Sequence, residues 1–185
     1  MSSARTIFDI CKQMEDEGFQ YGSLAGSQPF KKMTLGPYDM RKPTLKPYGL
    51  YFSKIVPFYL DIEDDTDVLS LGWHEWIVDE KLNIPEYSMR SLMFAKFDDS
   101  RLASEADPRF KNGGEYHMSC EYYQYPNWHK VANQFAGIHI DGRNPANYHV
   151  FPDWHVNTIC IWDPSVLTEF RWFPNAGKPW EYDSI

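Results

Sequence analysis

Short runs of aromatic and β-branched residues, each bounded by turn-forming residues, constrain the fold of this chain more than any other feature. We expect strands over 48–53 (YGLYFS), 91–97 (SLMFAKF), 137–140 (GIHI) and 157–162 (NTICIW), with shorter ones near 30–35 and 148–151. Apolar residues at helical spacing predict helices over 4–18, 69–81 and 128–135. Because helices and strands do not alternate strictly, this order favours an α+β fold.

Length and composition exclude several classes of protein. A chain of 185 residues predicts a single domain over 1–185. Hydrophobic residues make up 43% of the chain, which is enough for a packed core and argues against a disordered protein. The net charge of −8 argues against a general nucleic-acid binder, because neutralising phosphates requires a basic surface.

The cysteines and the apolar segments indicate where the protein resides. Cys11, Cys120 and Cys160 are too few and too scattered to form a disulfide framework. No segment approaches the roughly 20 apolar residues of a membrane helix, and the N-terminus lacks the apolar part of a signal peptide. We therefore expect a cytoplasmic protein that does not associate with membranes.

Basic residues are concentrated near the N-terminus. Residues 1–60 carry eight Lys and Arg against five Asp and Glu, whereas the rest of the chain carries ten against 21. Lys46 and Lys54 lie close in sequence to Tyr48 and Tyr51. This mixture is compatible either with an ordinary solvated surface or with a local anion site for a phosphate-bearing ligand.

Histidine and carboxylate residues are clustered in the second half of the chain. His139 and Asp141 form an H-x-D pair, and His149, Asp153 and His155 follow. A metal-dependent oxygenase with His139, Asp141 and His155 as iron ligands is one interpretation. Chance clustering is the other, and we predict no bound metal.

Five segments, taken in order, resemble the ADP-ribosyltransferase superfamily, in the His-Tyr-Glu branch that includes the poly-ADP-ribose polymerases. They are KPYGLYFS at 46–53, WHEWIVDE at 73–80, SLMFAKF at 91–97, WHKVANQFAGIHI at 128–140 and NTICIWDPSVLTEF at 157–170. The resemblance covers about 46–170, and it extends to small bacterial and phage proteins of this type. It implies a split, mainly antiparallel sheet, NAD as the substrate, and a macromolecular target that is either a protein or a nucleic acid.

The resemblance also implies which residues form the NAD site. A tyrosine in the GLYFS strand lies against the nicotinamide ring in this branch, which corresponds to Tyr51 here. Its ring offers stacking area, and Gly49 offers a position where a ligand or a neighbouring strand can approach closely. We expect the NAD-binding residues to be Lys46, Gly49, Tyr51, Ser53, Trp73 and Trp76.

Two catalytic positions of the branch differ in this chain. The branch has a histidine in its first strand, but all six histidines here lie after residue 46. Aligning the late strand places Thr158 where the branch has its catalytic glutamate. Glu80, on one predicted helix face with Trp73 and Trp76, is a candidate substitute. We therefore take Tyr51, Thr158 and Glu80 as the candidate catalytic residues.

Two functions follow from these observations. One is an NAD-dependent mono-ADP-ribosyltransferase that modifies a macromolecule. The other is a catalytically inactive relative that binds a nucleotide or a host protein, for example as a phage anti-defence or regulatory factor in the host cytoplasm.

Overall fold

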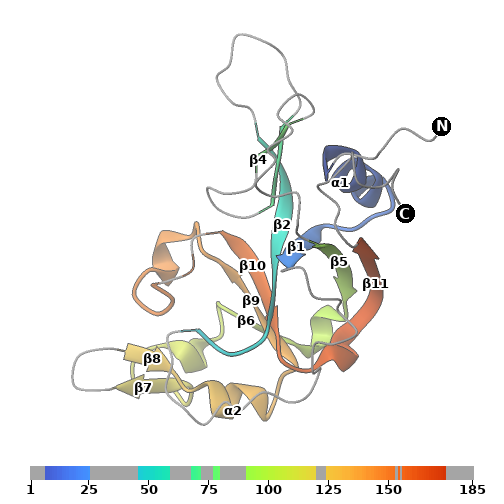
Figure 1. Ribbon diagram of the computed structural model, residues 1–185. Helices are drawn as coiled ribbons and strands as arrows, with labels where there is room; N and C mark the ends of the chain where they lie inside the picture. The colour runs from blue at the N-terminus through green and yellow to red at the C-terminus, as the bar shows by residue number, and fades with distance from the viewer. Residues whose placement is uncertain are drawn as a thin grey trace, which may run out of the picture. The chain divides into compact units, whose positions relative to one another are not determined.

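The computed structural model of the chain describes residues 7–25, 46–58, 68–71, 77–79, 91–119, 124–152, 154 and 156–173. These residues form an α+β fold that is mostly sheet, with two short α-helices (Figure 1). They divide into two compact units, and the chain passes between the units within strands β2 (Leu50–Phe58), β5 (Ser91–Phe97) and β11 (Leu167–Phe173). Within this part of the chain, no helix has the length and apolar character needed to cross a membrane.

The first unit combines helix α1 (Ile7–Asp16) with an antiparallel sheet. Its strand order is β11–β5–β1–β2–β3–β4, where β1 is Tyr21–Ala25, β3 is Val68–Leu71 and β4 is Ile77–Asp79. Apolar residues at helical spacing in α1, namely Ile10, Cys11 and Met14, are buried against Leu92 and Phe94 of β5. The predicted N-terminal helix is therefore confirmed over 7–16, and its apolar face is part of the core.

The second unit is built on the strand order β2–β10–β9–β6. Strand β10 (Asn157–Ile161) is antiparallel to β9 (Gly137–Asp141), and β9 is parallel to β6 (Leu102–Ser104). Helix α2 (Trp128–Ala132) and the separate hairpin of β7 (His117–Ser119) and β8 (Gln124–Pro126) belong to the same unit (Figure 1). A second core cluster joins these elements, with Trp128 and Val131 of α2 buried together with Ile138, Ile140 and Cys160.

The helix predicted over 69–81 is wrong in the residues that the structure describes. Val68–Leu71 and Ile77–Asp79 are antiparallel strands, and Leu69 pairs with Val78 in their register. The physical reason is that both ends of the range are rich in branched residues, which suit a strand, and that β2 offers β3 a pairing edge. The strand predicted over 148–151 is also wrong, because residues 145–147 form a 3₁₀-helix and a turn follows.

Other elements agree with the sequence or extend it. The strand over 91–97 is confirmed, the one expected over 48–53 lies at 50–58, and those near 137–140 and 157–162 are confirmed within one residue. Strands β1 and β11 were not predicted. The strand expected near 30–35 lies outside the described residues.

Asp and Asn side chains begin the short helices of the second unit. Asp107, Asn144 and Asp163 each precede a proline, and each side chain accepts the backbone N–H two residues farther along. Asp107 also accepts hydrogen bonds from Arg109, with Nε 3.0 Å from Oδ1 and Nη2 2.6 Å from Oδ2. These hydrogen bonds from Arg109 hold the pKa of the Asp107 carboxyl below its usual value.

Replacing Asp107 tests this interaction through the pH dependence of stability. A carboxyl whose pKa is lowered by folding stabilises the native state above its unfolded pKa of about 3.9, and this stability is lost as the pH falls through the folded pKa. Asp107→Asn should therefore melt below the wild type at pH 7, by a margin that shrinks as the pH falls below about 4. Thermal melts of both proteins between pH 7 and pH 2 measure this margin. A margin that stays constant with pH would show that the Asp107 charge contributes nothing.

Candidate functional site

The segment before β2 runs directly against strand β10. A Cβ atom placed on Gly49 would lie 2.4 Å from the carbonyl oxygen of Ile161 and 2.7 Å from Sγ of Cys160. Only a residue without a side chain allows this approach. The sequence analysis expected either a ligand or a neighbouring strand to approach Gly49 closely. In the structure, the neighbouring strand β10 does so.

The Tyr51 side chain lies half-buried in the second core cluster. Its ring centroid is 5.6 Å from that of Trp154, with an angle of 46° between the two planes. Its hydroxyl donates a hydrogen bond to the backbone carbonyl of Pro47. This bond ties the segment before β2 to the side chain of a residue in β2. Burial raises the pKa of the Tyr51 hydroxyl above its usual range, so the group stays a neutral donor.

A buried thiol adjoins the Tyr51 hydroxyl. Cys160 is fully buried in β10, and burial raises the pKa of its thiol to about 12. The thiol therefore stays protonated at neutral pH and has none of the thiolate character that a nucleophile needs.

Lys46 completes the group of side chains around Tyr51. Its Nζ lies over both rings, 5.9 Å from the Tyr51 centroid and 5.5 Å from the Trp154 centroid. With the 5.6 Å between the rings, the three groups form a nearly equilateral triangle. We call Lys46, Tyr51 and Trp154 the aromatic notch. Each ring face carries partial negative charge, so both rings attract the ammonium.

Trp154 was not among the predicted site residues. It is 2% exposed, and its indole Nε1 is buried without a hydrogen-bond partner in the part of the chain that the structure describes. The sequence shows only that Trp154 is an aromatic residue three positions before strand β10. No pattern in the sequence links it to Tyr51.

Thr158 lies on the same side of the sheet as this group. Thr158 and Cys160 are two residues apart in β10, so their side chains lie on the same face of the sheet. That face carries the second core cluster, which includes Cys160. Thr158 is 6% exposed, and its Oγ1 donates a hydrogen bond to the carbonyl of Val156 at 3.1 Å. The structure therefore brings Tyr51 and Thr158 to one face, but the hydroxyl of Thr158 is already engaged.

The remaining predicted residues do not join this group. Ser53 is half-buried in the first unit, where it pairs with Gly22 of β1. Trp73, Trp76 and Glu80 lie outside the described residues. The argument that placed those three on one helix face needed a helix over 69–81, and both described ends of that range are strands.

The residues of the H-x-D pair each make a hydrogen bond, and His139 alternates with Ile138 and Ile140 along β9, so it lies on the opposite face of the sheet from the second core cluster. His139 Nε2 lies 2.6 Å from Oδ1 of Asn157, and the backbone N–H of Asp141 donates to Glu105. Asp153 and His155 lie outside the described residues. Among the residues that are described, no three His, Cys, Asp or Glu side chains are grouped so that they could hold a metal ion.

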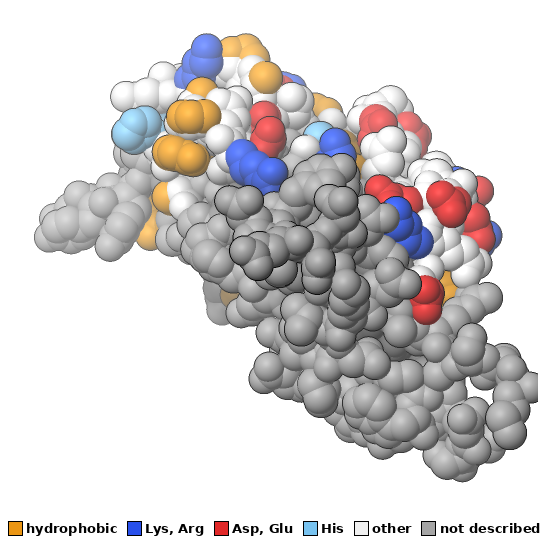
Figure 2. All heavy atoms as spheres, turned by 90° about the horizontal axis from the view of Figure 1, so that it is seen from above, with side chains coloured by type: hydrophobic (Ala, Val, Ile, Leu, Met, Phe, Trp, Pro, Cys, Tyr) orange, Lys and Arg blue, Asp and Glu red, His pale blue; other side chains and the backbone are white. Residues whose placement is uncertain are grey.

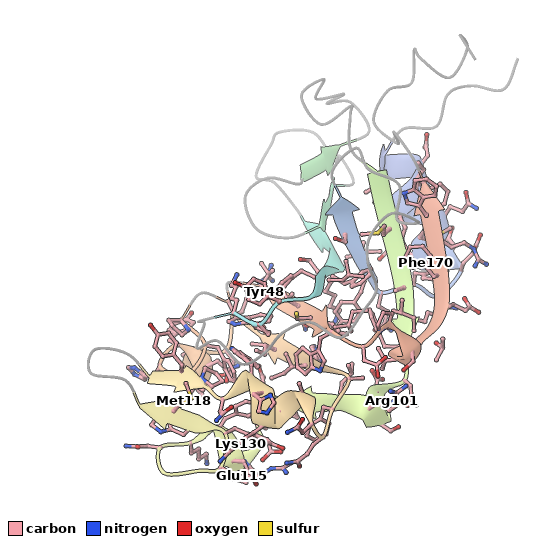
Figure 3. The ribbon with its side chains drawn as sticks, turned by 60° about the horizontal axis from the view of Figure 1, so that its bottom comes forward. Tyr48, Arg101, Glu115, Met118, Lys130 and Phe170 are labelled. Carbon is pink, nitrogen blue, oxygen red and sulfur yellow. The ribbon has the colours of Figure 1, made fainter. Side chains whose placement is uncertain are left out.

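The segment that carries the notch also exposes an aromatic residue. Tyr48 is 52% exposed just before β2 (Figure 3), and Lys46 is exposed beside it in sequence. On the face drawn in Figure 2, acidic and basic side chains of the described residues are intermixed.

Comparisons with protein-family models, with curated proteins and with solved structures gave no match to this chain.

Replacing Gly49 tests whether close contact with β10 holds the site together. Gly49→Ala forces a methyl group against backbone atoms of β10, which we expect to lower the free energy of unfolding by about 1–3 kcal/mol. Chemical denaturation measures this change, with Lys54→Ala at an exposed position of the following strand β2 as the control. A Gly49→Ala protein as stable as the wild type would contradict the close approach.

Proposed function

We propose that this chain is an NAD-binding protein with an ADP-ribosyltransferase-like fold, in which the split, mainly antiparallel sheet carries a nucleotide site without transferase activity. The observation that carries the proposal is the aromatic notch, because it combines a stacking surface with a cation at the start of the GLYFS strand. The resemblance in the sequence assigns nicotinamide to this strand.

The chemistry of the notch suits two parts of NAD, the nicotinamide ring and the pyrophosphate. A flat ring stacked on one aromatic side chain gains on the order of 1–3 kcal/mol, by analogy with nucleic-acid bases. The Lys46 ammonium is a compact charge on a flexible stem, which suits a pyrophosphate.

Transfer of ADP-ribose requires more than binding. Cleaving the bond to nicotinamide builds positive charge on the ribose, and a carboxylate is the group that stabilises this charge. Thr158, at the position that the resemblance gives to glutamate, is neutral, and its hydroxyl donates to Val156. The six histidines all lie after residue 46, so none precedes the GLYFS strand. These features favour the binding protein over the transferase.

Binding is tested by calorimetric titration with NAD. The wild type should bind, and Tyr51→Ala should weaken binding by about 5- to 150-fold, the equivalent of losing one stacked ring. Tyr51→Phe keeps the ring and loses only the hydrogen bond to Pro47, so its effect on binding should be much smaller.

Two further measurements separate the alternatives. Thermal melts of both Tyr51 variants show whether lost binding reflects lost folding. Incubation with labelled NAD in a cell lysate detects transfer to a macromolecule, and we expect none. Label transfer that depends on Tyr51 would establish the transferase instead, and a folded wild type that does not bind NAD would refute both functions.

A further inference from the structure

The turn before strand β7 contains the one Asn-Gly pair of the sequence. Asn112 and Gly113 are its central residues, and the backbone N–H of Gly114 closes it by donating to the carbonyl of Lys111 at 2.8 Å. Gly113 has a φ of +79°, a left-handed value that favours glycine at the third position of such a turn. The turn therefore places next to Asn112 a residue that has no side chain to shield its backbone nitrogen.

Both residues of the pair are accessible to solvent. Asn112 and Gly113 are exposed, and a Cβ atom placed on Gly113 would have no heavy atom within 4 Å. Glu115 of the same loop is also exposed (Figure 3). Neither the Asn112 amide nor the Gly113 N–H has a hydrogen-bond partner in the part of the chain that the structure describes. The fold therefore does not hold the Asn112 side chain away from the nitrogen that follows it.

We propose that Asn112 is a site of spontaneous modification, at which the side-chain amide is converted through a cyclic imide to a mixture of aspartate and isoaspartate. The Gly113 nitrogen bonds to Cγ of Asn112, the bond from Cγ to Nδ2 breaks, and ammonia leaves with the proton of the Gly113 N–H. This inference is independent of the proposed function.

Water completes the reaction by opening the imide. Addition of water at Cγ breaks the bond from Cγ to the nitrogen and gives aspartate with the original backbone. Addition at the backbone carbonyl carbon breaks the other bond to the nitrogen and gives isoaspartate, whose chain runs through the former side chain. No atom is oxidised or reduced, and water is the one reagent consumed.

A second pair in the same unit shows what protection by the fold looks like. Asp141 also precedes a glycine, and an aspartate in this position forms the same imide with loss of water. Gly142 is buried, however, and its N–H donates to the carbonyl of Val156 at 3.1 Å. Oδ1 of Asp141 accepts the backbone N–H of Arg143 at 3.0 Å. Attack there requires both hydrogen bonds to break, so the folded chain should protect Asp141 and leave Asn112 reactive.

Isoaspartate at this position would alter the packing of the turn. It adds a methylene group to the backbone between Lys111 and Gly114. Gly114 has no room to move inward, because a Cβ atom placed on it would lie 2.3 Å from the carbonyl oxygen of Arg109. The same carbonyl accepts the N–H of Tyr116, a residue fully buried in the second core cluster. The longer backbone therefore disturbs a contact that leads into the core, and the modified protein should melt below the unmodified one.

The test compares each site with itself in folded and unfolded protein. The full chain is incubated at mildly alkaline pH, with and without guanidinium chloride, and both sites are followed by peptide mass spectrometry and by enzymatic methylation of isoaspartate. Asn112 in folded protein should react within about tenfold of its rate in denaturant, a barrier difference of at most about 1.4 kcal/mol. Asp141 should be slowed by more than about tenfold on folding.

Two variants identify the reacting residue. Asn112→Gln keeps an exposed amide but requires a larger ring to form, so isoaspartate at this position should be lost. Asn133→Gln changes another exposed asparagine of the same unit, one that precedes a residue with a side chain, and should leave the reaction unchanged. Thermal melts verify that both variants are folded. Ion exchange separates the modified wild type, which carries an additional negative charge, for its own melt.

Four results would overturn the inference. They are an Asn112 that reacts in denaturant but not in folded protein, aspartate formed without isoaspartate, an Asp141 that reacts as fast in folded protein as in denaturant, and a modified protein that melts with the unmodified one. The first would show that the turn protects the pair, and the second that water attacks the amide directly. The third would remove the role of the Gly142 hydrogen bond, and the fourth the coupling of the turn to the core.

Discussion

The contact between Gly49 and strand β10 is the constraint on which the candidate site depends. A methyl group at this position would collide with the carbonyl of Ile161 and with Sγ of Cys160. The close approach carries Pro47 to the point where its carbonyl accepts a hydrogen bond from Tyr51, and it brings Lys46 over the two rings. The absence of a side chain at Gly49 thereby helps to position the Lys46 ammonium and the Tyr51 hydroxyl. Close packing of the backbone, and not attraction between charges, determines where these groups lie.

The groups next to the Tyr51 hydroxyl are poorly suited to acid–base or nucleophilic chemistry at neutral pH. Tyr51 and Cys160 are kept neutral because burial raises the pKa of both groups. Thr158 is buried, and its hydroxyl donates a hydrogen bond to the backbone carbonyl of Val156. Such a site can offer an aromatic face and attract charge. This is the physical reason for proposing a binding protein in place of a transferase.

Local patterns in the sequence predicted the fold better than they predicted the site. Strand β5 and helix α1 followed from runs and spacings that lie within a few residues. Over 69–81 the spacing of apolar residues suited a helix, but pairing of β3 with β2 and β4 decided the outcome. Tyr51 and Lys46 were proposed as site residues from one short motif and the resemblance that it carries. Trp154 could not be predicted in this way. It lies about a hundred positions from Tyr51 in the sequence, and only the folded chain brings the two side chains together.

The indole N–H of Trp154 reports most directly on whether the notch binds a nicotinamide ring. Proton–nitrogen NMR spectra of protein labelled at tryptophan resolve the indole signals, and the Trp154→Phe variant identifies the signal of Trp154. We predict that oxidised NAD shifts this signal in a saturable manner. A Trp154 signal that does not move at saturating oxidised NAD would contradict the proposal that the nicotinamide ring stacks on Tyr51, whose ring contacts Trp154.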